Sequence, residues 1–387
     1  MKVDKELIVD ILDKVEGRSD MDWAEIAQKH MPDMHPETLR KAGVGIKWAA
    51  AANMISMQTE REPAYDETYR AKKQFYDQRR EYNKLLTDEA RADHLMEHLI
   101  AAARKLNSSY PLERNPVCSW LKGSGKAEAV LVLTDWHLGM VTDNVWNRYD
   151  VDICKQRVKH LIGLASERLI RHDVGKLHVF VLGDMANGAI HVSSRVASEE
   201  DVCDQLMQVS EMIAQVVSEL ANCTDVVQVY CTYGNHMRTV QNSKDSIHSD
   251  NMEKIIPWWM SQRFKDRDDI SIMENGRHEL LRAVVCGYEV CGVHGDLDFG
   301  KDRLLVLDQL YRKTFGMKMN YLFSGHFHSA ENTEALGMEA IRSGSLCGTD
   351  EFAKNKRLFS DPKQTLAIFA PHYGLDAVYH LRVGGGE

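Results

Sequence analysis

The sequence has 387 residues, 44% of them hydrophobic and 27% charged, which is an ordinary balance for a soluble globular protein. No apolar run approaches the roughly 20 residues that span a bilayer, and residues 1–10 lack the apolar core of a signal peptide, so we expect a cytoplasmic protein with no membrane partner. The net charge of −9 argues against a large non-specific DNA-binding surface, although it allows a local basic patch.

Residues 1–57 are predicted to form a small helical domain. Asp22 can cap a first helix, and after a short turn Pro36 fits the first position of a second helix. Helix, turn and a helix that carries Arg40 and Lys41 resemble a helix-turn-helix unit, in which these two side chains would contact DNA. The alternative is a helical cap that only packs on the main domain.

Residues 58–125 form a charge-dense segment in which acidic and basic residues alternate, with aromatic residues such as Phe75 and Tyr82 between them. This pattern predicts one or two long, solvated helices that link the domains. The basic residues with aromatic neighbours could also touch a phosphate backbone, but a solvated helix face is the preferred interpretation.

From residue 126 to residue 387 the pattern changes to short apolar strands, each followed by polar residues and then by a helix. Alternation of this kind predicts an α/β domain. The last strands follow one another closely, so part of the sheet structure is expected to be mixed or antiparallel. Ligands of such domains gather at the carboxyl ends of strands.

Polar residues of the kind that bind metals follow five of the predicted strands. In chain order they are Asp135-Trp136-His137, Gly183-Asp184, Gly234-Asn235-His236, His294-Gly295-Asp296 and Gly325-His326-Phe327-His328. Carboxylates and imidazoles without thiolates suit Mn²⁺, Fe or Zn²⁺. The period of two in a strand is expected to place both side chains of Asp-x-His and of His-x-His on one side of a strand end. Each motif alone is weak, but five in order rarely arise by chance.

The eight cysteines stand apart from these motifs, at positions 118, 154, 203, 223, 231, 286, 291 and 347. No two of them form a CxxC pair, which argues against a zinc knuckle and against a thioredoxin-like site. We therefore expect reduced thiols, as in a reducing compartment.

The ordered set DxH…GD…GNH…HGD…GHxH closely resembles the calcineurin-like metallophosphoesterase superfamily, over about residues 126–387. The resemblance implies an α/β fold, a sandwich of two mixed β-sheets flanked by helices, and it leaves an N-terminal all-α region outside the matching part. It also implies two divalent transition metals, with Mn²⁺ expected and Fe or Zn²⁺ as alternatives.

The same resemblance implies a role for each residue of the motifs. One metal would be bound by Asp135, His137, Asp184 and His328, and the other by Asp184, Asn235, His294 and His326. A metal-bridging hydroxide would then attack a phosphodiester. His236 would contact the phosphate or protonate the leaving oxygen as a general acid.

Two positions depart from the family pattern. Many family phosphatases have an acid three residues after the bridging Asp184, and exonucleases often have a histidine there, whereas this chain has Asn187. Asn187 is expected to hold His236 in place without stabilising its imidazolium as a carboxylate would. The acid that usually follows GNH is also missing, and Arg238 is a predicted phosphate contact, with a plain surface arginine as the alternative.

His191 and Arg195 are weaker candidates for substrate contacts, because they follow the second ligand motif. A mobile surface loop is the alternative for this segment. Residues 342–345 resemble the segment that closes the site in this superfamily.

The leading hypothesis for function is a Mn-dependent DNA nuclease that acts as an exonuclease, an endonuclease or both. It rests on the resemblance of the ligand set to Sbc/Mre-type nucleases and to phage-borne phosphoesterases of DNA repair, and on the helix-turn-helix pattern. Because related nucleases dimerise, a homodimer is also expected. Two alternatives stay open: a phosphodiesterase or phosphatase for small nucleotides or phosphoproteins, and a DNA-binding or assembly protein whose metal site is vestigial.

Overall fold

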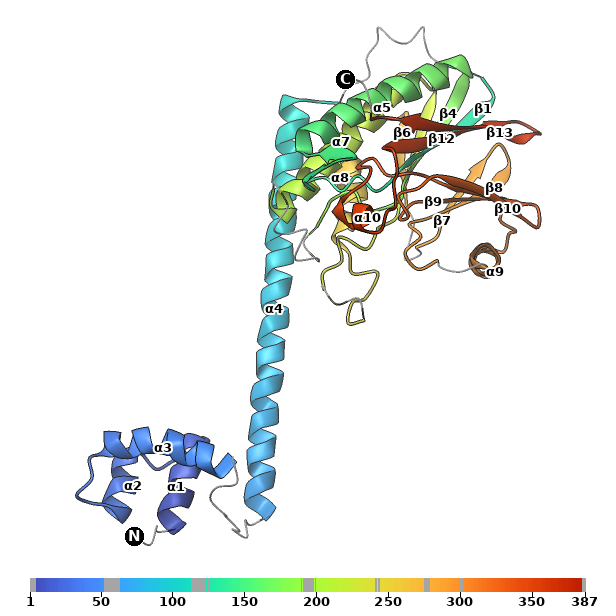
Figure 1. Ribbon diagram of the computed structural model, residues 1–387. Coiled ribbons are helices and arrows are strands. Elements are labelled where there is room, and N and C mark those ends of the chain that lie inside the picture. The colour runs from blue at the N-terminus through green and yellow to red at the C-terminus, as the bar shows by residue number, and fades with distance from the viewer. Residues whose placement is uncertain are drawn as a thin grey trace. The chain divides into compact units, whose positions relative to one another are not determined.

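The computed structural model divides into two compact units, residues 1–95 and 96–387, with the boundary inside a long helix, α4 (Pro63–Ser109) (Figure 1). It describes residues 5–51, 63–112, 123, 125–188, 190, 198, 200–240, 242, 244–274, 279–298 and 302–384. The domains drawn from the sequence, 1–57, 58–125 and 126–387, stay a prediction. No helix in the described ranges is both long and apolar enough to cross a bilayer.

The first unit contains three short helices around a small apolar core. These helices are α1 (Lys5–Val15), α2 (Trp23–His30) and α3 (Pro36–Ala51). The Asp22 carboxylate accepts hydrogen bonds from the backbone N–H groups of Ala24 and Glu25, and the Glu25 side chain accepts one from the Asp22 N–H, which completes a capping box. The predicted helix start at Asp22 is therefore confirmed.

The second unit is built on two β-sheets. The first has the strand order β13-β12-β1-β4-β5-β6 and the second the order β10-β11-β9-β8-β7. The strands of the first sheet are β1 (Ala127–Leu133), β4 (Val174–Val181), β5 (Val226–Cys231), β6 (Ile270–Met273), β12 (Lys363–Ala370) and β13 (Gly374–Arg382). In the second they are β7 (Leu281–Val285), β8 (Tyr288–Val293), β9 (Tyr321–Ser324), β10 (Glu331–Ala335) and β11 (Met338–Arg342).

Both sheets are mixed. In the first, β1, β4, β5 and β6 run parallel, and β12 is antiparallel to both β1 and β13. In the second, β9 is parallel to β8 and β11, whereas β7 and β10 pair antiparallel with their neighbours. The carboxyl ends of β1, β4 and β5 therefore meet at one edge of the first sheet, and those of β8 and β9 at one edge of the second.

The two sheets face one another across a continuous apolar core. Val130, Val132 and Phe180 of the first sheet share this core with Val290 and Phe323 of the second. Because side chains alternate along a strand, the residues between them face the outer helices, which leaves the central strands apolar on both sides.

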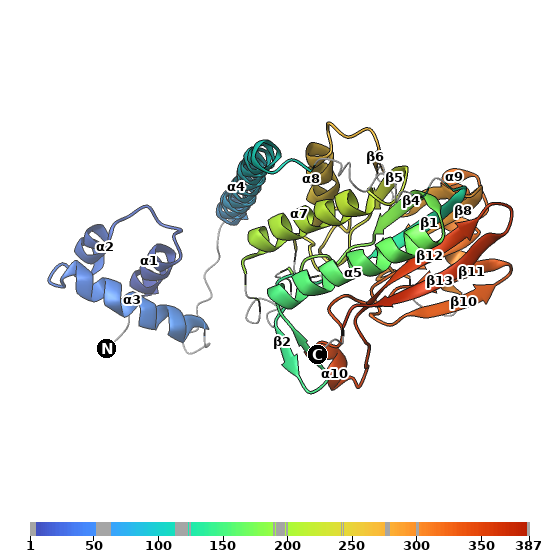
Figure 2. The ribbon, with the colours of Figure 1, turned by 90° about the horizontal axis from the view of Figure 1, so that it is seen from above.

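Helices cover the outer faces of the sandwich (Figures 1 and 2). They are α5 (Val151–Arg171), α7 (Val202–Leu220) and α8 (Ile255–Arg263) on the first sheet and α9 (Arg303–Phe315) on the second. Shorter elements lie near the strand ends: the hairpin β2 (Thr142–Asn144) and β3 (Asn147–Tyr149), the 3₁₀ helix η2 (Met252–Lys254) and α10 (Glu351–Asn355). The predicted α/β sandwich with an N-terminal all-α region is confirmed.

A buried polar network fixes the end of α4 to the second unit. The Arg263 side chain, which is fully buried, donates two hydrogen bonds of 2.9 Å to the Glu211 carboxylate. It also donates to the Asn107 side chain and to the carbonyl of Tyr110. The indole N–H of Trp259 donates to the same carboxylate, at 3.1 Å. Both ends of this ion pair are thus surrounded by partners.

Candidate metal centre

The predicted metal ligands lie directly beyond the carboxyl ends of β1, β4, β5, β8 and β9, and their backbone is unusual. Five of the seven have positive φ angles: Asp135 (54°), His137 (48°), Asp184 (52°), His326 (67°) and His328 (57°). For residues other than glycine such angles cost about 1–3 kcal/mol each and persist only when the surroundings impose them. Convergence of the side chains was expected from the period of a strand. The structure shows that it comes from these left-handed turns instead.

The first group of ligands surrounds Asp135. The Nε2 atoms of His137 and His328 lie 3.1 Å apart. Asp135 Oδ1 lies 3.6 Å from Nε2 of His328 and 3.9 Å from Nε2 of His137. The other carboxylate oxygen, Oδ2, accepts hydrogen bonds from the His326 N–H and the Thr134 hydroxyl. Oδ1 therefore points toward the two imidazoles.

The second group surrounds Asp184. Its Oδ2 lies 3.1 Å from Nε2 of His294, and that nitrogen lies 3.2 Å from Nδ1 of His326. Nδ1 of His294 donates to the carbonyl of Leu182 at 2.7 Å, which orients Nε2 toward the carboxylate. Gly234 packs so closely that a Cβ there would lie 2.1 Å from Asp184 Oδ1, so only glycine fits.

His236 lies between the two groups. Its Nε2 is 4.0 Å from Asp184 Oδ2, and its ring centroid is 4.5 Å from that of His137. Its backbone N–H donates to Asp184 Oδ1 at 2.8 Å. Its Nδ1 hydrogen-bonds to the backbone carbonyl of Asn187 at 2.9 Å, whereas the Asn187 side chain donates to Ser198. The main chain at Asn187, and not its amide as expected, thus orients the histidine.

The unsatisfied atoms of the site fit divalent cations. Among the described residues, Asp135 Oδ1 and Asn235 Oδ1 are buried oxygens without a hydrogen-bond partner. Asn235 stands between Gly234, which abuts Asp184, and His236, whose N–H donates to Asp184. Buried oxygens rarely lack partners unless an ion or a water binds them. Two carboxylates, one amide oxygen and several imidazoles form a donor set that suits Mn²⁺, Fe or Zn²⁺.

The electrostatics of the site also favour cations. Burial would raise the pKa of Asp184, but the charges of His294 and His236 outweigh burial and hold this pKa well below its usual value. Burial would lower the pKa of His294, but Asp184 raises it to about 10. Burial lowers the pKa of His137 well below its usual value, which leaves the neutral imidazole that ligates metals. A bound cation would therefore replace the proton on His294 beside Asp184.

Two residues of the site were not found from the sequence. The buried Glu253 of η2 accepts hydrogen bonds from the backbone N–H groups of Asp184, Met185 and Gly234, and burial raises its pKa to about 7. No motif marks it. The buried Cys347 has its Sγ 4.0 Å from Nδ1 of His328. It lies two residues beyond the segment 342–345, whose place at the site the sequence did indicate.

The other residues predicted to contact substrate or DNA are Arg238, His191, Arg195, Arg40 and Lys41. The Arg238 guanidinium donates to the carbonyls of Asn235 and Val240, which ties it to its own loop. His191 and Arg195 lie outside the described residues. Arg40 and Lys41 belong to the first unit, on α3.

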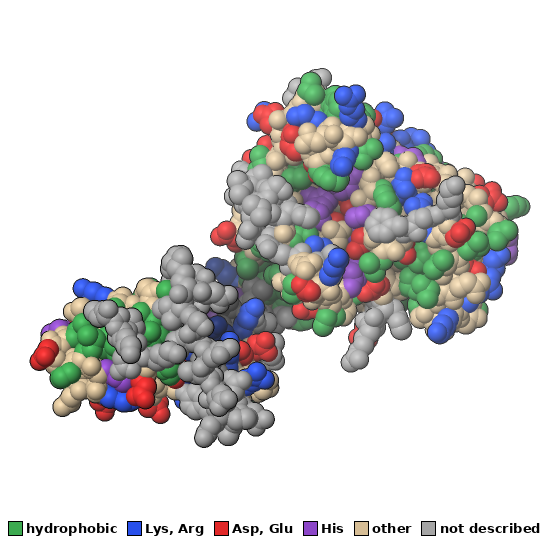
Figure 3. Space-filling view, turned by 60° about the horizontal axis from the view of Figure 1, so that its bottom comes forward, with side chains coloured by type: hydrophobic (Ala, Val, Ile, Leu, Met, Phe, Trp, Pro, Cys, Tyr) green, Lys and Arg blue, Asp and Glu red, His purple; other side chains and the backbone are tan. Residues whose placement is uncertain are grey.

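The site thus belongs to the class of centres rich in imidazole and carboxylate that can hold divalent metal ions. Three sets of side chains are close enough to share a cation: His137 with His328 and Cys347, His137 with Asp184 and His236, and Asp184 with His294 and His326. Histidine side chains gather beside carboxylates on one face of the second unit (Figure 3).

Comparisons with known proteins give only distant similarities to solved structures. No family model matches the sequence, and no curated protein is similar to it. An archaeal phosphodiesterase has 12% identity and a TM-score of 0.32, over 65% of this chain and 99% of that one. Zinc-bound Vps29 of Entamoeba histolytica has 11% identity and a TM-score of 0.30, over 66% and 99%. A protein from Streptococcus pneumoniae predicted to be a phosphoesterase has 11% identity and a TM-score of 0.30, over 66% of this chain and 90% of that one. These values are too low to assign a family.

Proposed function

We propose that the chain is a phosphodiesterase with a dinuclear metal centre, and that its substrate is DNA. The observation that carries the proposal is the pair of ligand groups: His137 and His328 approach the buried, unpartnered Oδ1 of Asp135, and His294 lies between Asp184 and His326. Two divalent cations bound there, with Mn²⁺ proposed, would supply a nucleophile at neutral pH and stabilise an in-line displacement at phosphorus.

The residues of the chain itself supply the proton for the leaving group. Nδ1 of His236 is held by the carbonyl of Asn187, so its Nε2 faces the space beside Asp184. From this position Nε2 can protonate the leaving oxygen. The neutral carbonyl of Asn187 orients the ring, but it stabilises the imidazolium less than a carboxylate would.

The first unit supports DNA as the substrate. The helix-turn-helix pattern of α2 and α3 leaves Arg40 and Lys41 exposed on α3, while Leu39 of the same helix is buried in the core. Arg40 is paired with the exposed Glu37 at 3.0 Å, an interaction that a phosphate could replace at little cost. We extend the proposal to DNA contacts by Arg40 and Lys41, and to a homodimer through the exposed aromatic residues of α4, such as Phe75 and Tyr82.

The net charge of −9 favours a second candidate, a phosphodiesterase or phosphatase for small nucleotides or phosphoproteins. Such an enzyme would use the same metal centre and needs no basic groove.

Cleavage assays separate these candidates. Purified protein with Mn²⁺ is incubated with end-labelled single- and double-stranded DNA, and in parallel with an aryl phosphodiester and an aryl phosphomonoester. The proposal predicts DNA cleavage that requires Mn²⁺ and falls by about 10²–10⁴-fold in His236→Ala. Cleavage of the aryl esters while DNA stays intact would support the second candidate. Cleavage of none of them would overturn both.

A further inference from the structure

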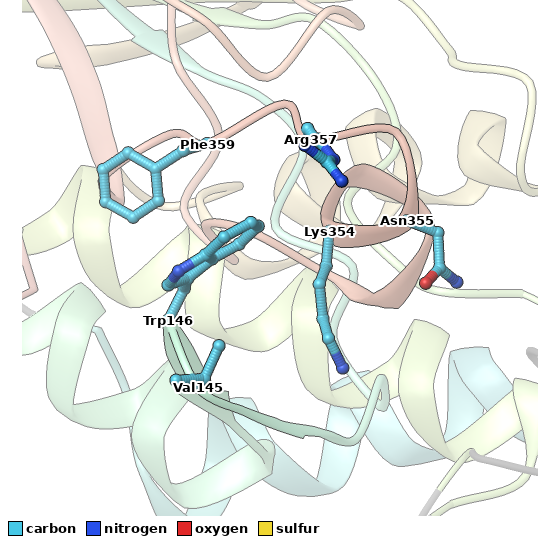
Figure 4. A pocket seen from close by; sticks show the side chains of 6 residues that line it. All are labelled: Val145, Trp146, Lys354, Asn355, Arg357 and Phe359. Carbon is cyan, nitrogen blue, oxygen red and sulfur yellow. The ribbon is translucent and has the colours of Figure 1, made fainter.

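An open pocket of about 630 Å³ lies on the second unit between the β2–β3 hairpin and α10 (Figure 4). Its lining residues are Val145, Trp146, Lys354, Asn355, Arg357 and Phe359. None of them belongs to the ligand groups, and no motif of the sequence pointed to them.

The tip of the hairpin exposes apolar side chains. Asn144 pairs with Asn147, so Val145 and Trp146 form a two-residue turn, and Asn144 Oδ1 accepts the N–H groups of Trp146 and Asn147 at 2.9 and 3.0 Å. Gly, Asn and Asp are the usual residues of such turns. Here the side chains are 82% exposed at Val145 and 45% exposed at Trp146. Since the asparagine already holds the turn, the fold does not require an indole there.

The end of α10 carries an arginine where the fold favours glycine. The N–H of Arg357 bonds to the carbonyl of Lys354 and the N–H of Leu358 to that of Ala353, which is a Schellman motif. Arg357 occupies its left-handed position, with φ of 58°. A residue other than glycine costs about 1–2 kcal/mol there. Within the described residues no ion pair or hydrogen bond of the Arg357 guanidinium accounts for this cost.

The pocket combines aromatic faces with positive charge. The rings of Trp146 and Phe359 lie edge to face, with centroids 6.1 Å apart. Lys354 and Arg357 line the pocket, and Lys354 is paired with the exposed Glu351 at 3.1 Å, an interaction that a phosphate could replace at little cost. Aromatic faces that stack bases, beside cations that bind phosphates, are the elements that recognise single-stranded nucleic acid.

Hydrogen bonds connect both walls of the pocket to the metal centre. Ser360, next to Phe359, donates its hydroxyl to the carbonyl of His328 at 2.5 Å. Asn147, next to Trp146, donates its amide to the carbonyl of Cys347 at 2.8 Å. Cys347 in turn contacts the His328 ring. A nucleotide in the pocket would therefore lie beside the segment that carries a metal ligand.

We propose that this pocket binds an unpaired nucleotide of the DNA substrate, with the base against Trp146 and Phe359 and the phosphate held by Lys354 and Arg357. This inference rests on the proposed nuclease function. Bases in a duplex are stacked on one another and cannot offer a free face to the indole. The pocket therefore selects single strands or unpaired ends.

The test measures binding of a fluorescent ten-nucleotide oligothymidylate to the full chain by anisotropy, with Mn²⁺ and in a His236→Ala background that limits cleavage. Trp146→Ala is expected to weaken binding about 10-fold or more, and Trp146→Phe, which keeps an aromatic face, by about threefold or less. Arg357→Gly is expected to weaken binding about 10-fold. Its melting temperature should equal or exceed that of the parent protein, because glycine relieves the left-handed strain.

Controls separate this site from bulk electrostatics. Lys265→Ala removes an exposed cation beyond α8 and should change binding by about twofold or less. A blunt duplex and thymidine monophosphate are tested with the same variants. If Trp146→Ala and Arg357→Gly lose affinity only for the oligothymidylate, the proposal is supported. An equal loss of affinity for the duplex, or a loss of affinity for thymidine monophosphate alone, would overturn it.

The outcomes also distinguish the two proposals. If the wild-type protein cleaves DNA while Trp146→Ala and Arg357→Gly bind the oligothymidylate like the parent, the pocket inference fails and the nuclease stands. If the wild-type protein cleaves only the aryl diester and binds no oligonucleotide, the nuclease proposal itself fails.

Discussion

The candidate metal centre and the Arg263–Glu211 network are both largely buried clusters of charged side chains, but they differ in how many of their polar atoms have hydrogen-bond partners. In the network, Arg263 and Glu211 bond to each other, and Asn107, Tyr110 and Trp259 complete the pair. In the metal centre, buried oxygens lack partners and most ligands adopt left-handed backbone angles. A cluster whose polar atoms all have partners stabilises the fold, whereas buried atoms without partners on a strained backbone indicate a ligand-binding site.

The largest effect is expected from Asp184→Asn, because Asp184 contacts ligands of both groups. The charge is lost while the shape is kept, so Mn²⁺ content should fall and diester hydrolysis should drop by about 10⁴-fold or more. Asp152→Asn, on the exposed start of α5, is the matched control and should leave both unchanged. Normal metal content in Asp184→Asn would show that Asp184 does not bridge.

His236→Ala sharpens the distinction between binding and catalysis. Since His236 is proposed to transfer a proton rather than to hold metal, kcat should fall about 10²–10⁴-fold while Mn²⁺ content stays the same. Elemental analysis and initial rates on an aryl diester measure the two quantities. A variant that loses metal in parallel with activity would recast His236 as a ligand.

Arg263→Ala tests the other side of the comparison. It leaves the half-buried Glu211 without its charge partner and removes the buried guanidinium that binds Asn107 and Tyr110, which should reduce the free energy of unfolding by about 2–4 kcal/mol, measured by urea titration. Lys155→Ala breaks an exposed pair with Asp152 and should cost less than about 1 kcal/mol. Mn²⁺ content per folded chain should be normal in both. If Arg263→Ala lowered the Mn²⁺ content without lowering the free energy of unfolding, the network would belong to the metal site and the contrast between the two clusters would be wrong.

The smallest effect concerns His248, which joins the loop after β5 to Asp296 and Glu279 at 3.2 and 2.7 Å. Hydrogen bonds to Asp296 and Glu279 raise the pKa of His248 to about 9 from 6.5, against the effect of burial. The stability it contributes, about 1–3 kcal/mol, is fully present below pH 6.5 and is lost as the pH rises to about 9.

His248→Gln should therefore lower the free energy of unfolding at pH 6 and leave it nearly unchanged at pH 9.5. Urea titrations of both proteins at the two pH values give the difference. An equal destabilisation at both would exclude the protonated histidine as the cause.

The sequence predicted the fold class, and it predicted that the candidate ligands follow five strands, because the order of strands and motifs is local information. That these residues bind metal stays a prediction. The sequence did not predict the left-handed angle at Asp184 or at His328, since these arise where loops from distant parts of the chain meet. Glu253 and Cys347 were missed for the same reason: they contact the site through the fold and not through a motif. The hairpin that carries Trp146 was missed because its strands are only three residues long.

Equilibrium dialysis of the purified full-length protein against Mn²⁺, followed by elemental analysis, tests the central claim most directly. The wild-type protein should retain about two Mn²⁺ per chain, and His294→Ala should retain about one fewer. A wild-type protein that retains none, or a His294→Ala protein with an unchanged content, would contradict the dinuclear centre.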